Sequence, residues 1–177
     1  MDNFVILTGC SGGGKSTLLA ELARRGLATV EEPGRRIVRH QQAISGRALP
    51  WIDLAAFAQE AIRLGREDRR RMAGHGGRVF FDRSLIDATS ALAIATGDQS
   101  EIEALRTDGR YHHRVFAVAP WPEIFVEDQE RRHDFAAAVE EYERLGALYA
   151  DPGYTWTIIP KASIAERADF VLRTLEN

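Results

Sequence analysis

The segment that most constrains this chain lies directly after its first apolar run. Residues 9–16 read GCSGGGKS, residues 4–7 before them read FVIL, and residues 17–23 after them read TLLAELA. This is the spacing G-x-x-x-x-G-K-[ST], set between a strand-like run and a helix-like run. In that context the motif indicates a loop that cradles the phosphates of a nucleoside triphosphate.

The composition of this loop follows from phosphate binding. Backbone N–H groups must curl around the phosphate chain, and residues without a Cβ let the main chain come that close. The helix N-terminus that follows adds unpaired N–H groups and a positive dipole end. We expect Lys15 to reach the β- and γ-phosphates from a solvent-facing position, and the Ser16 hydroxyl to ligate Mg²⁺. The expected cofactors are ATP, with GTP left open, and Mg²⁺, and the expected nucleotide-binding residues are Gly9, Ser11, Gly12, Gly13, Gly14, Lys15, Ser16 and Thr17.

Composition excludes several classes of protein. The 177 residues suffice for one domain, and 45% hydrophobic with 28% charged residues is typical of soluble globular proteins. The net charge of −3 argues against bulk attraction to nucleic acid or to a membrane surface, and no apolar run approaches the ~20 residues of a membrane span. The early first strand and the single cysteine, Cys10, predict a cytoplasmic protein without signal peptide or disulfide. Monomer and homodimer both stay open.

Strand-like and helix-like stretches alternate along the chain, which predicts an α/β fold with a parallel sheet. The expected strands are residues 4–8, 28–31, 78–82, 115–119 and 155–159. The expected helices are residues 15–25, 35–45, 53–72, 86–95, 101–107, 123–129, 134–150 and 163–175. We therefore expect residues 1–177 to form one P-loop NTPase domain, a three-layer sandwich with a five-stranded parallel sheet and helices on both faces.

The end of the second expected strand carries a pair of acids, Glu31 and Glu32, before Pro33 and Gly34 break the strand. Ligands of such sheets bind at the carboxyl ends of the strands. A carboxylate held there can accept the proton of a substrate hydroxyl that attacks the γ-phosphate, and Glu32 is the candidate base, with Glu31 as the alternate. The other interpretation is that these acids only favour the next helix and pair with its arginines.

The third expected strand ends in the sequence FFDRS at residues 80–84. An apolar strand that ends in Asp82 is typical of a Walker B strand, whose carboxylate holds Mg²⁺ directly or through water. Arg83 would then contact phosphate oxygens or orient the base. Alternatively, Asp82 or Ser84 only caps the following helix.

A pair of arginines, Arg131 and Arg132, lies between two late helical stretches. A lid over about residues 120–135 would bring them to the phosphates, where they would neutralise charge and exclude water. A solvated charged turn is the alternative. Further on, Ser163 and Glu166 have the spacing of a capping box, which we favour over a contact of this turn with a purine ring.

The long helical region before the third strand carries Trp51, Phe57, Gln59 and Ile62. Most of these are expected in the core, although the region also offers side chains for an acceptor pocket. The run REDRRR at residues 66–71 mixes both signs, which favours an exposed helix face over a nucleic-acid site.

Taken in order, GCSGGGKS, EEPGRRIV, FFDRS, ERRHDF and EEYERL make the chain resemble the P-loop kinase-like ATPases related to the ribosylnicotinamide kinase domain. The Glu-Pro and Asp-Arg-Ser elements are also similar to the Glu-Pro and Glu-Arg-Ser motifs of deoxynucleoside kinases. This resemblance implies that Glu32 is the base, that Arg83 contacts phosphates and that Arg131 and Arg132 close over ATP. It also implies that Gln59 reads a base. Asp82 departs from the pattern, because those kinases have a longer glutamate there.

These observations predict a kinase that transfers the γ-phosphoryl group of ATP to a hydroxyl of a nucleoside-like small molecule. The main rival is a regulatory ATPase, in which bound nucleotide orders the lid for a protein partner. Two further functions are compatible with the same loop: phosphorylation of nucleic-acid ends and simple triphosphate hydrolysis. The acidic net charge argues against the first of them.

Overall fold

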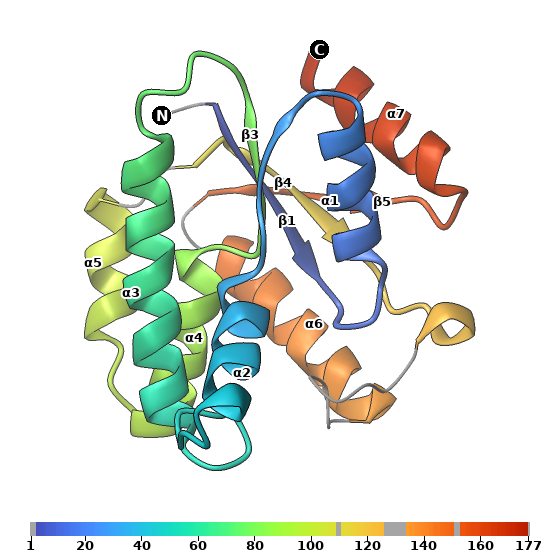
Figure 1. Cartoon of the computed structure of the whole chain (residues 1–177). Coiled ribbons are helices and arrows are strands. Elements are labelled where there is room, and N and C mark those ends of the chain that lie inside the picture. Colours follow the sequence, from blue (N-terminus) through green and yellow to red (C-terminus); the bar gives the residue numbers. More distant parts are fainter. Residues whose placement is uncertain (1–2, 109–110, 126–133, 151–152, 177) are drawn as a thin grey trace.

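A five-stranded parallel sheet forms the centre of the protein (Figure 1). The computed structural model describes residues 3–108, 111–125, 134–150 and 153–176. The strand order is β2-β3-β1-β4-β5, and each neighbouring pair is parallel. The strands are β1 (Phe4–Gly9), β2 (Ala28–Val30), β3 (Val79–Asp82), β4 (Arg114–Val118) and β5 (Thr155–Ile159). The expected fold class is confirmed, and each strand lies within one residue of its predicted bounds.

Helices cover both faces of this sheet (Figure 1). One face packs against α1 and α7, and the other packs against α3, α4, α5 and α6. The α-helices are α1 (Lys15–Arg24), α2 (Pro33–Ala43), α3 (Leu54–Met72), α4 (Leu85–Thr96), α5 (Ser100–Asp108), α6 (Phe135–Ala150) and α7 (Ile164–Glu176). In the described part of the chain, no helix is both long and apolar enough to span a bilayer.

The residues of β1 explain why it occupies the middle of the sheet. Successive strand side chains point to opposite faces, so a strand that is covered on both faces must be apolar throughout. Val5 and Leu7 pack in the core beneath α1 and α7, whereas Phe4 and Ile6 pack in the core on the other side. The strand ends at Gly9, at the carboxyl edge of the sheet, where its neighbours β3 and β4 also end.

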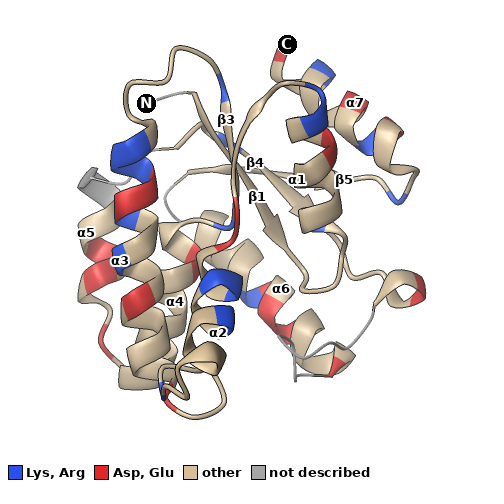
Figure 2. Ribbon diagram, viewed as in Figure 1, with Lys and Arg blue, Asp and Glu red and all other residues tan. Residues whose placement is uncertain are grey.

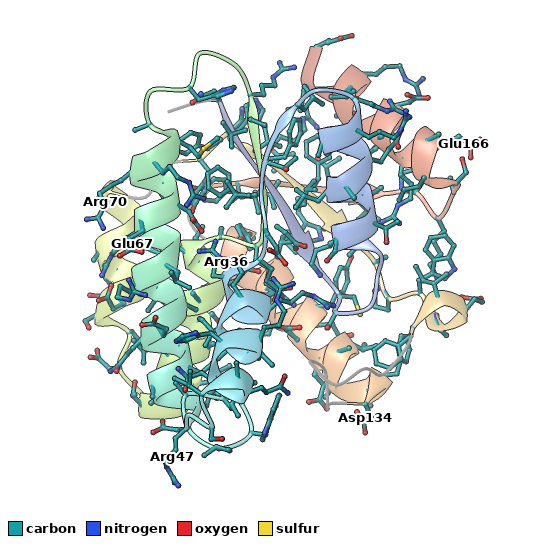
Figure 3. The ribbon with its side chains drawn as sticks, viewed as in Figure 1. Arg36, Arg47, Glu67, Arg70, Asp134 and Glu166 are labelled. Carbon is teal, nitrogen blue, oxygen red and sulfur yellow. The ribbon has the colours of Figure 1, made fainter. Side chains whose placement is uncertain are left out.

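The helix α3 shows how far a charge pattern predicts exposure. Basic and acidic residues are interspersed along it (Figure 2), and Glu67 and Arg70 lie on its outer side (Figure 3). The exposed helix face expected at residues 66–71 is present only in part: Arg66, Arg70 and Arg71 are exposed, whereas Asp68 and Arg69 are buried. Asp68 accepts from Arg36 of α2 at 2.6 Å, so this acid joins α2 to α3.

The predicted helix at residues 123–129 is also wrong at its start. Pro122–Ile124 form a single 3-10 turn, and Phe125 is extended. Its ring lies against the glycine loop at Gly12 and makes an edge-on contact with Phe135, with ring centroids 5.3 Å apart. Residues 126–129 lie outside the described chain.

The capping box before α7 is confirmed, since Ser163 N–H donates to Glu166 at 3.0 Å and Glu166 lies at the outer surface (Figure 3).

Candidate active site

The glycine-rich loop joins β1 to α1 at the carboxyl edge of the sheet. Gly9 has a φ of +103°, and a Cβ at this position would lie 2.4 Å from the carbonyl oxygen of Val118. Gly14, with a φ of +79°, is the N-cap of α1. These left-handed conformations are the ones that glycine adopts without steric cost. The loop therefore curls tightly and presents the first N–H groups of α1 toward the cavity beside it.

The expected solvent-facing position of Lys15 is wrong. Its side chain is only 6% exposed, and its Nζ donates to the carbonyl oxygens of Cys10, at 3.0 Å, and Gly9, at 3.5 Å. Burial, followed by the nearby charge of Arg83, lowers the pKa of Lys15. Among the described residues no carboxylate forms an ion pair with it. The loop surrounds the Lys15 side chain, and the sequence motif alone does not predict this burial.

A cavity of about 380 Å³ opens beside the loop. Among the predicted nucleotide-binding residues, those that line it are Ser11, Gly12, Gly14, Lys15, Ser16 and Thr17. Gly9 and Gly13 do not line it, because both pack against Val118 of β4. The far side of the cavity is formed by Trp121, Ile124, Ala162, Ile164 and Arg167. We name this space the nucleotide cavity.

Ser16, which lines the nucleotide cavity, contacts the buried Asp82 at the end of β3. The Ser16 hydroxyl donates to Asp82 Oδ2 at 3.0 Å. Within the described chain, Asp82 Oδ1 is buried and has no hydrogen-bond partner. Burial, with a further contribution from Glu32, raises the pKa of Asp82 to about 6. A buried oxygen without a partner fits a cation that this structure does not contain.

The donor set here suits Mg²⁺ better than a transition metal. The described residues contain no cluster of three or more His, Cys, Asp or Glu side chains that would form an all-protein metal site. Mg²⁺ is usually held by one or two protein oxygens together with substrate phosphates and water. Ser16 and Asp82 supply oxygens of this kind beside the phosphate loop. Their assignment as metal ligands remains a prediction.

Arg83 lies next in the chain and has an unusual backbone. Its φ of +66° is left-handed, a conformation that costs a non-glycine residue roughly 1–3 kcal/mol. The side chain is held by three carboxylates: Nε lies 3.2 Å from Glu32 Oε1, Nη1 lies 3.3 Å from Asp87, and Nη2 lies 3.0 Å from Glu141. Burial alone would lower the pKa of Arg83, but Glu141 and then Glu32 raise it well above its ordinary value.

Asp87 anchors this cluster from α4. Its Oδ2 accepts from the Ser84 hydroxyl and backbone N–H, both at 2.9 Å, and from the Tyr149 hydroxyl at 2.5 Å. The Thr8 hydroxyl donates to Oδ1. Burial raises the pKa of Asp87, but Arg83 and these donors outweigh it, so the pKa lies below the ordinary value. Ser84 also caps α4, as one interpretation of the sequence held, since its hydroxyl accepts from Ile86 N–H at 3.0 Å.

We name Thr8, Arg83, Ser84, Asp87, Glu141 and Tyr149 the paired cluster. Sequence reasoning missed Thr8, Asp87, Glu141 and Tyr149. A signal for Asp87 existed, because it follows Ser84 by three residues and completes a capping box. The position of Tyr149, 62 residues away on α6, carries no local signal.

A second cavity, of about 440 Å³, lies on the other side of Glu32. Apolar side chains from α2, α3, α4 and the segment between α2 and α3 line most of it, including Val38, Trp51, Leu54, Phe57 and Ile94. Charged side chains gather at one end, namely Glu32, Arg35, Arg83, Asp87, Glu141 and Arg144. We name this space the acceptor cavity.

The base-reading role that the resemblance implied for Gln59 is not supported. Gln59 is exposed and does not line the acceptor cavity. On α3 the lining positions are 54, 57, 58 and 61, which follow the three- and four-residue spacing of one helix face. A residue two positions after Phe57 lies on another face. The expectation that most of Trp51, Phe57, Gln59 and Ile62 lie in the core is wrong, because only Ile62 is buried, whereas Trp51 and Phe57 are partly exposed and line the acceptor cavity.

Glu32 and its alternate, Glu31, have different surroundings. Glu32 lines both cavities and contacts Arg83, and its Oε2 lies 3.6 Å from Arg35 Nε. Glu31 lines neither cavity, is half exposed and pairs with Arg39 on the surface. The two predicted lid arginines, Arg131 and Arg132, lie outside the described residues.

Comparisons with known proteins agree with this architecture. The family described as an AAA domain, AAA_28, matches residues 4–167. A comparison with curated protein sequences gave no match. Deoxyadenosine kinase from M. mycoides with bound dATP is 9% identical with a TM-score of 0.63, and covers 98% of this chain and 100% of its own. The same kinase with products is 14% identical with a TM-score of 0.60, covering 98% of both chains.

Shikimate kinase from Acinetobacter baumannii in complex with shikimate is 15% identical, with a TM-score of 0.56, and covers 98% of this chain and 91% of its own. At these identities the solved structures show a shared fold. The expected fold, a five-stranded parallel sheet with helices on both faces, is the fold that this chain shares with these structures.

Proposed function

This chain belongs to the AAA-domain family AAA_28, and we propose that it is a Mg²⁺- and ATP-dependent kinase that phosphorylates a hydroxyl of a nucleoside-like small molecule. One observation carries the proposal: the nucleotide cavity and the acceptor cavity share Ser11, Glu32 and Arg35. A carboxylate therefore lies where a triphosphate and a second small molecule would meet. A regulatory switch needs the first cavity but has no use for the second.

In the proposed reaction, Glu32 accepts the proton of the acceptor hydroxyl as its oxygen attacks the γ-phosphorus. The bond from this phosphorus to the bridging oxygen breaks, and ADP leaves with that electron pair. Of the two roles expected for Arg83, its contacts favour orienting the base, because Nε reaches Glu32 while the other two nitrogens reach Asp87 and Glu141.

The remaining residues would act by charge and position. Lys15 and the loop amides would hold the β- and γ-phosphates, for which Nζ must exchange its carbonyl partners for phosphate oxygens. Ser16 and Asp82 would hold Mg²⁺, which neutralises phosphate charge when bound. Arg131 and Arg132 are proposed to close over the nucleotide as parts of a lid.

The acceptor cavity supports a substrate with a flat apolar body and a hydroxyl at one end. Trp51, Phe57 and Leu54 offer the apolar contacts, and the charged end lies at Glu32. A cavity of this size suits a nucleoside-sized molecule. The described walls offer no glutamine to read a base, so recognition in the proposed kinase differs from the one that the resemblance implied.

The test is transfer of the γ-phosphoryl group from Mg·ATP to a panel of nucleosides, ribosylnicotinamide, nucleoside monophosphates and short oligonucleotides. Glu32→Gln should lower turnover on the order of 10²- to 10⁴-fold while ATP still binds. Glu31→Gln is the matched control, because it changes the neighbouring carboxylate, which lines neither cavity. Its turnover should stay near that of the native protein.

Two results would overturn the proposal. If ATP binds, no acceptor is phosphorylated and Glu32→Gln has no effect on ATP hydrolysis, the regulatory switch replaces the kinase. If Glu31→Gln and Glu32→Gln lower turnover equally, the shared carboxylate is not the base.

A further inference from the structure

Arg167 reaches the phosphate loop from α7, 154 residues further along the chain. Its side chain is 3% exposed, and Nη2 donates to the carbonyl oxygen of Gly13 at 2.9 Å. Nη1 lies so close to Gly14 that a Cβ there would be 2.7 Å from it. The guanidinium therefore rests directly on the loop, at the N-terminal end of α1.

Among the described residues, no acidic side chain balances the charge of Arg167. In the described ranges no carboxylate forms an ion pair with it, and its buried Nε has no hydrogen-bond partner. Burial lowers the pKa of this guanidinium, and no acid in the described part of the chain counteracts that effect. Buried charges are normally paired and hydrogen-bonded, because an isolated charge is costly to remove from water.

Arg25 provides the contrast on the same side of the sheet. Its guanidinium donates to Glu21 at 2.8 Å and to Asp169 of α7 at 2.5 Å. It thus joins α1 to α7 through ordinary ion pairs. Arg167 joins the same two helices only through the loop carbonyl, which takes up one of its donors.

The surroundings of Arg167 indicate an anion as the missing partner. Arg167 lines the nucleotide cavity together with Ser16 and Thr17 of α1. Its Cζ lies 5.7 Å from the ring centroid of Trp121, which also lines the cavity. Arg167 therefore has a donor without a partner, Nε, and borders the nucleotide cavity, where the phosphate chain is proposed to bind.

We propose that Arg167 is a nucleotide-binding residue, whose guanidinium neutralises a phosphate of the bound nucleoside triphosphate from the α7 side of the loop. This inference extends the nucleotide site of the proposed function and requires only that a triphosphate binds. It therefore holds for a kinase and for a switch alike. Absence of phosphoryl transfer would contradict the proposed function and leave this site intact.

The experiment measures binding of ATP and of inorganic tripolyphosphate by calorimetry, and thermal unfolding of the ligand-free protein. Arg167→Met removes the charge and keeps the length. A lost charge-assisted hydrogen bond is worth roughly 1.5–3 kcal/mol, so both dissociation constants should rise roughly 10- to 100-fold. The melting temperature of the free protein should not fall, because an unbalanced buried charge has been removed.

Arg25→Met is the matched control, since it removes an arginine that joins the same helices through ion pairs. It should lower the melting temperature and leave both dissociation constants unchanged. Arg167→Lys, which keeps the charge, should fold like the native protein and bind with intermediate affinity.

The proposal is overturned if Arg167→Met and Arg167→Lys both bind ATP within twofold of the native protein. It is also overturned if Arg167→Met weakens ATP but not tripolyphosphate, which would place the contact on the base. A fall in melting temperature without any loss of affinity would make Arg167 a structural link between α7 and the loop.

Discussion

Asp82 and Asp87 are both buried and lie close together in the chain, yet their pKa values move in opposite directions. Burial raises the pKa of Asp82 to about 6, and one of its oxygens has no partner among the described residues. At Asp87 the charge of Arg83 and several donors outweigh burial and lower the pKa. The first aspartate accepts a hydrogen bond from Ser16, which lines the nucleotide cavity, and the second belongs to the paired cluster.

The same contrast extends to the other charged residues of each region. Beside the nucleotide cavity, Lys15 and Arg167 are buried without carboxylate partners in the described chain. In the paired cluster, Arg83 has three carboxylates around it. Buried charges that lack partners indicate where a charged ligand binds, whereas satisfied ones hold the scaffold that positions the base. Substitutions in the two regions should therefore have opposite effects on stability and activity.

The largest effect is expected for Lys15→Ala. Without the ammonium, phosphoryl transfer or ATP hydrolysis should fall on the order of 10³-fold, because one preorganised charge at the transferring group is lost. The melting temperature of the free protein should stay within a few degrees of native, since no ion pair is broken in the described part. Lys161→Ala, at an exposed turn, is the control for both assays. Unchanged nucleotide affinity in Lys15→Ala would contradict the assignment of the loop.

Asp87→Ala should have the opposite profile, with its main effect on folding. It breaks a buried ion pair with Arg83 and removes the acceptor of Ser84 and Tyr149. Such a loss costs about 3–5 kcal/mol, which urea denaturation will detect as a lower midpoint. Glu143→Ala, at an exposed position of α6, should change stability by less than about 0.5 kcal/mol. Equal urea midpoints for Asp87→Ala and its control variant would contradict the distinction between the paired cluster and the nucleotide cavity.

Asp82→Asn should stabilise the free protein. The pKa of Asp82 is raised from 3.8 to about 6, so between these values the folded state holds a proton that the unfolded chain has released. The folded state therefore loses stability as pH rises through this window, by at most about 3 kcal/mol at neutral pH. The asparagine variant should lack this loss, and its Mg²⁺-dependent turnover should also disappear.

The sharpest comparison sets Asp82→Asn beside Asp87→Asn in the same pH series. For Asp87 the lowered pKa means that its stabilisation is present above the ordinary value and is lost as pH falls through the folded value. Asp87→Asn should thus lower stability at pH 7, where Asp82→Asn raises it. Shifts of the same sign for both variants would show that the two environments do not differ.

The smallest effect is expected for Tyr149→Phe. The hydroxyl donates to Asp87 and lies 2.6 Å from the Ser84 hydroxyl, while the ring stays in the core. Removing one hydrogen bond to a charged group should cost about 1.5–3 kcal/mol of unfolding free energy. Tyr154→Phe, whose hydroxyl accepts from Tyr111 N–H at 3.3 Å, is a control with a weaker bond and should cost less. A larger loss in Tyr154→Phe would indicate that Tyr149 is not part of the cluster.

Local sequence determined the elements and the phosphate loop. The continuous apolar run of β1, the glycine spacing, and the capping residues Ser84 and Ser163 act over a few residues, through backbone sterics and short hydrogen bonds. Such features depend on residues that are close together in the sequence, so the sheet, the loop and the place of Glu32 at a strand end could all be predicted. The helix expected at residue 123 failed because Phe125 turns toward the loop and Phe135 instead.

Only the tertiary structure decided which charges are buried and which of them have partners. Lys15 is enclosed by its own loop, Gln59 lies on the wrong face of α3 for the acceptor cavity, and Arg167 reaches back to Gly13. Each of these outcomes depends on how helices pack across the sheet. Burial and electrostatics are properties of three-dimensional distance, and residues more than a hundred positions apart can set them, so no local pattern contains that information.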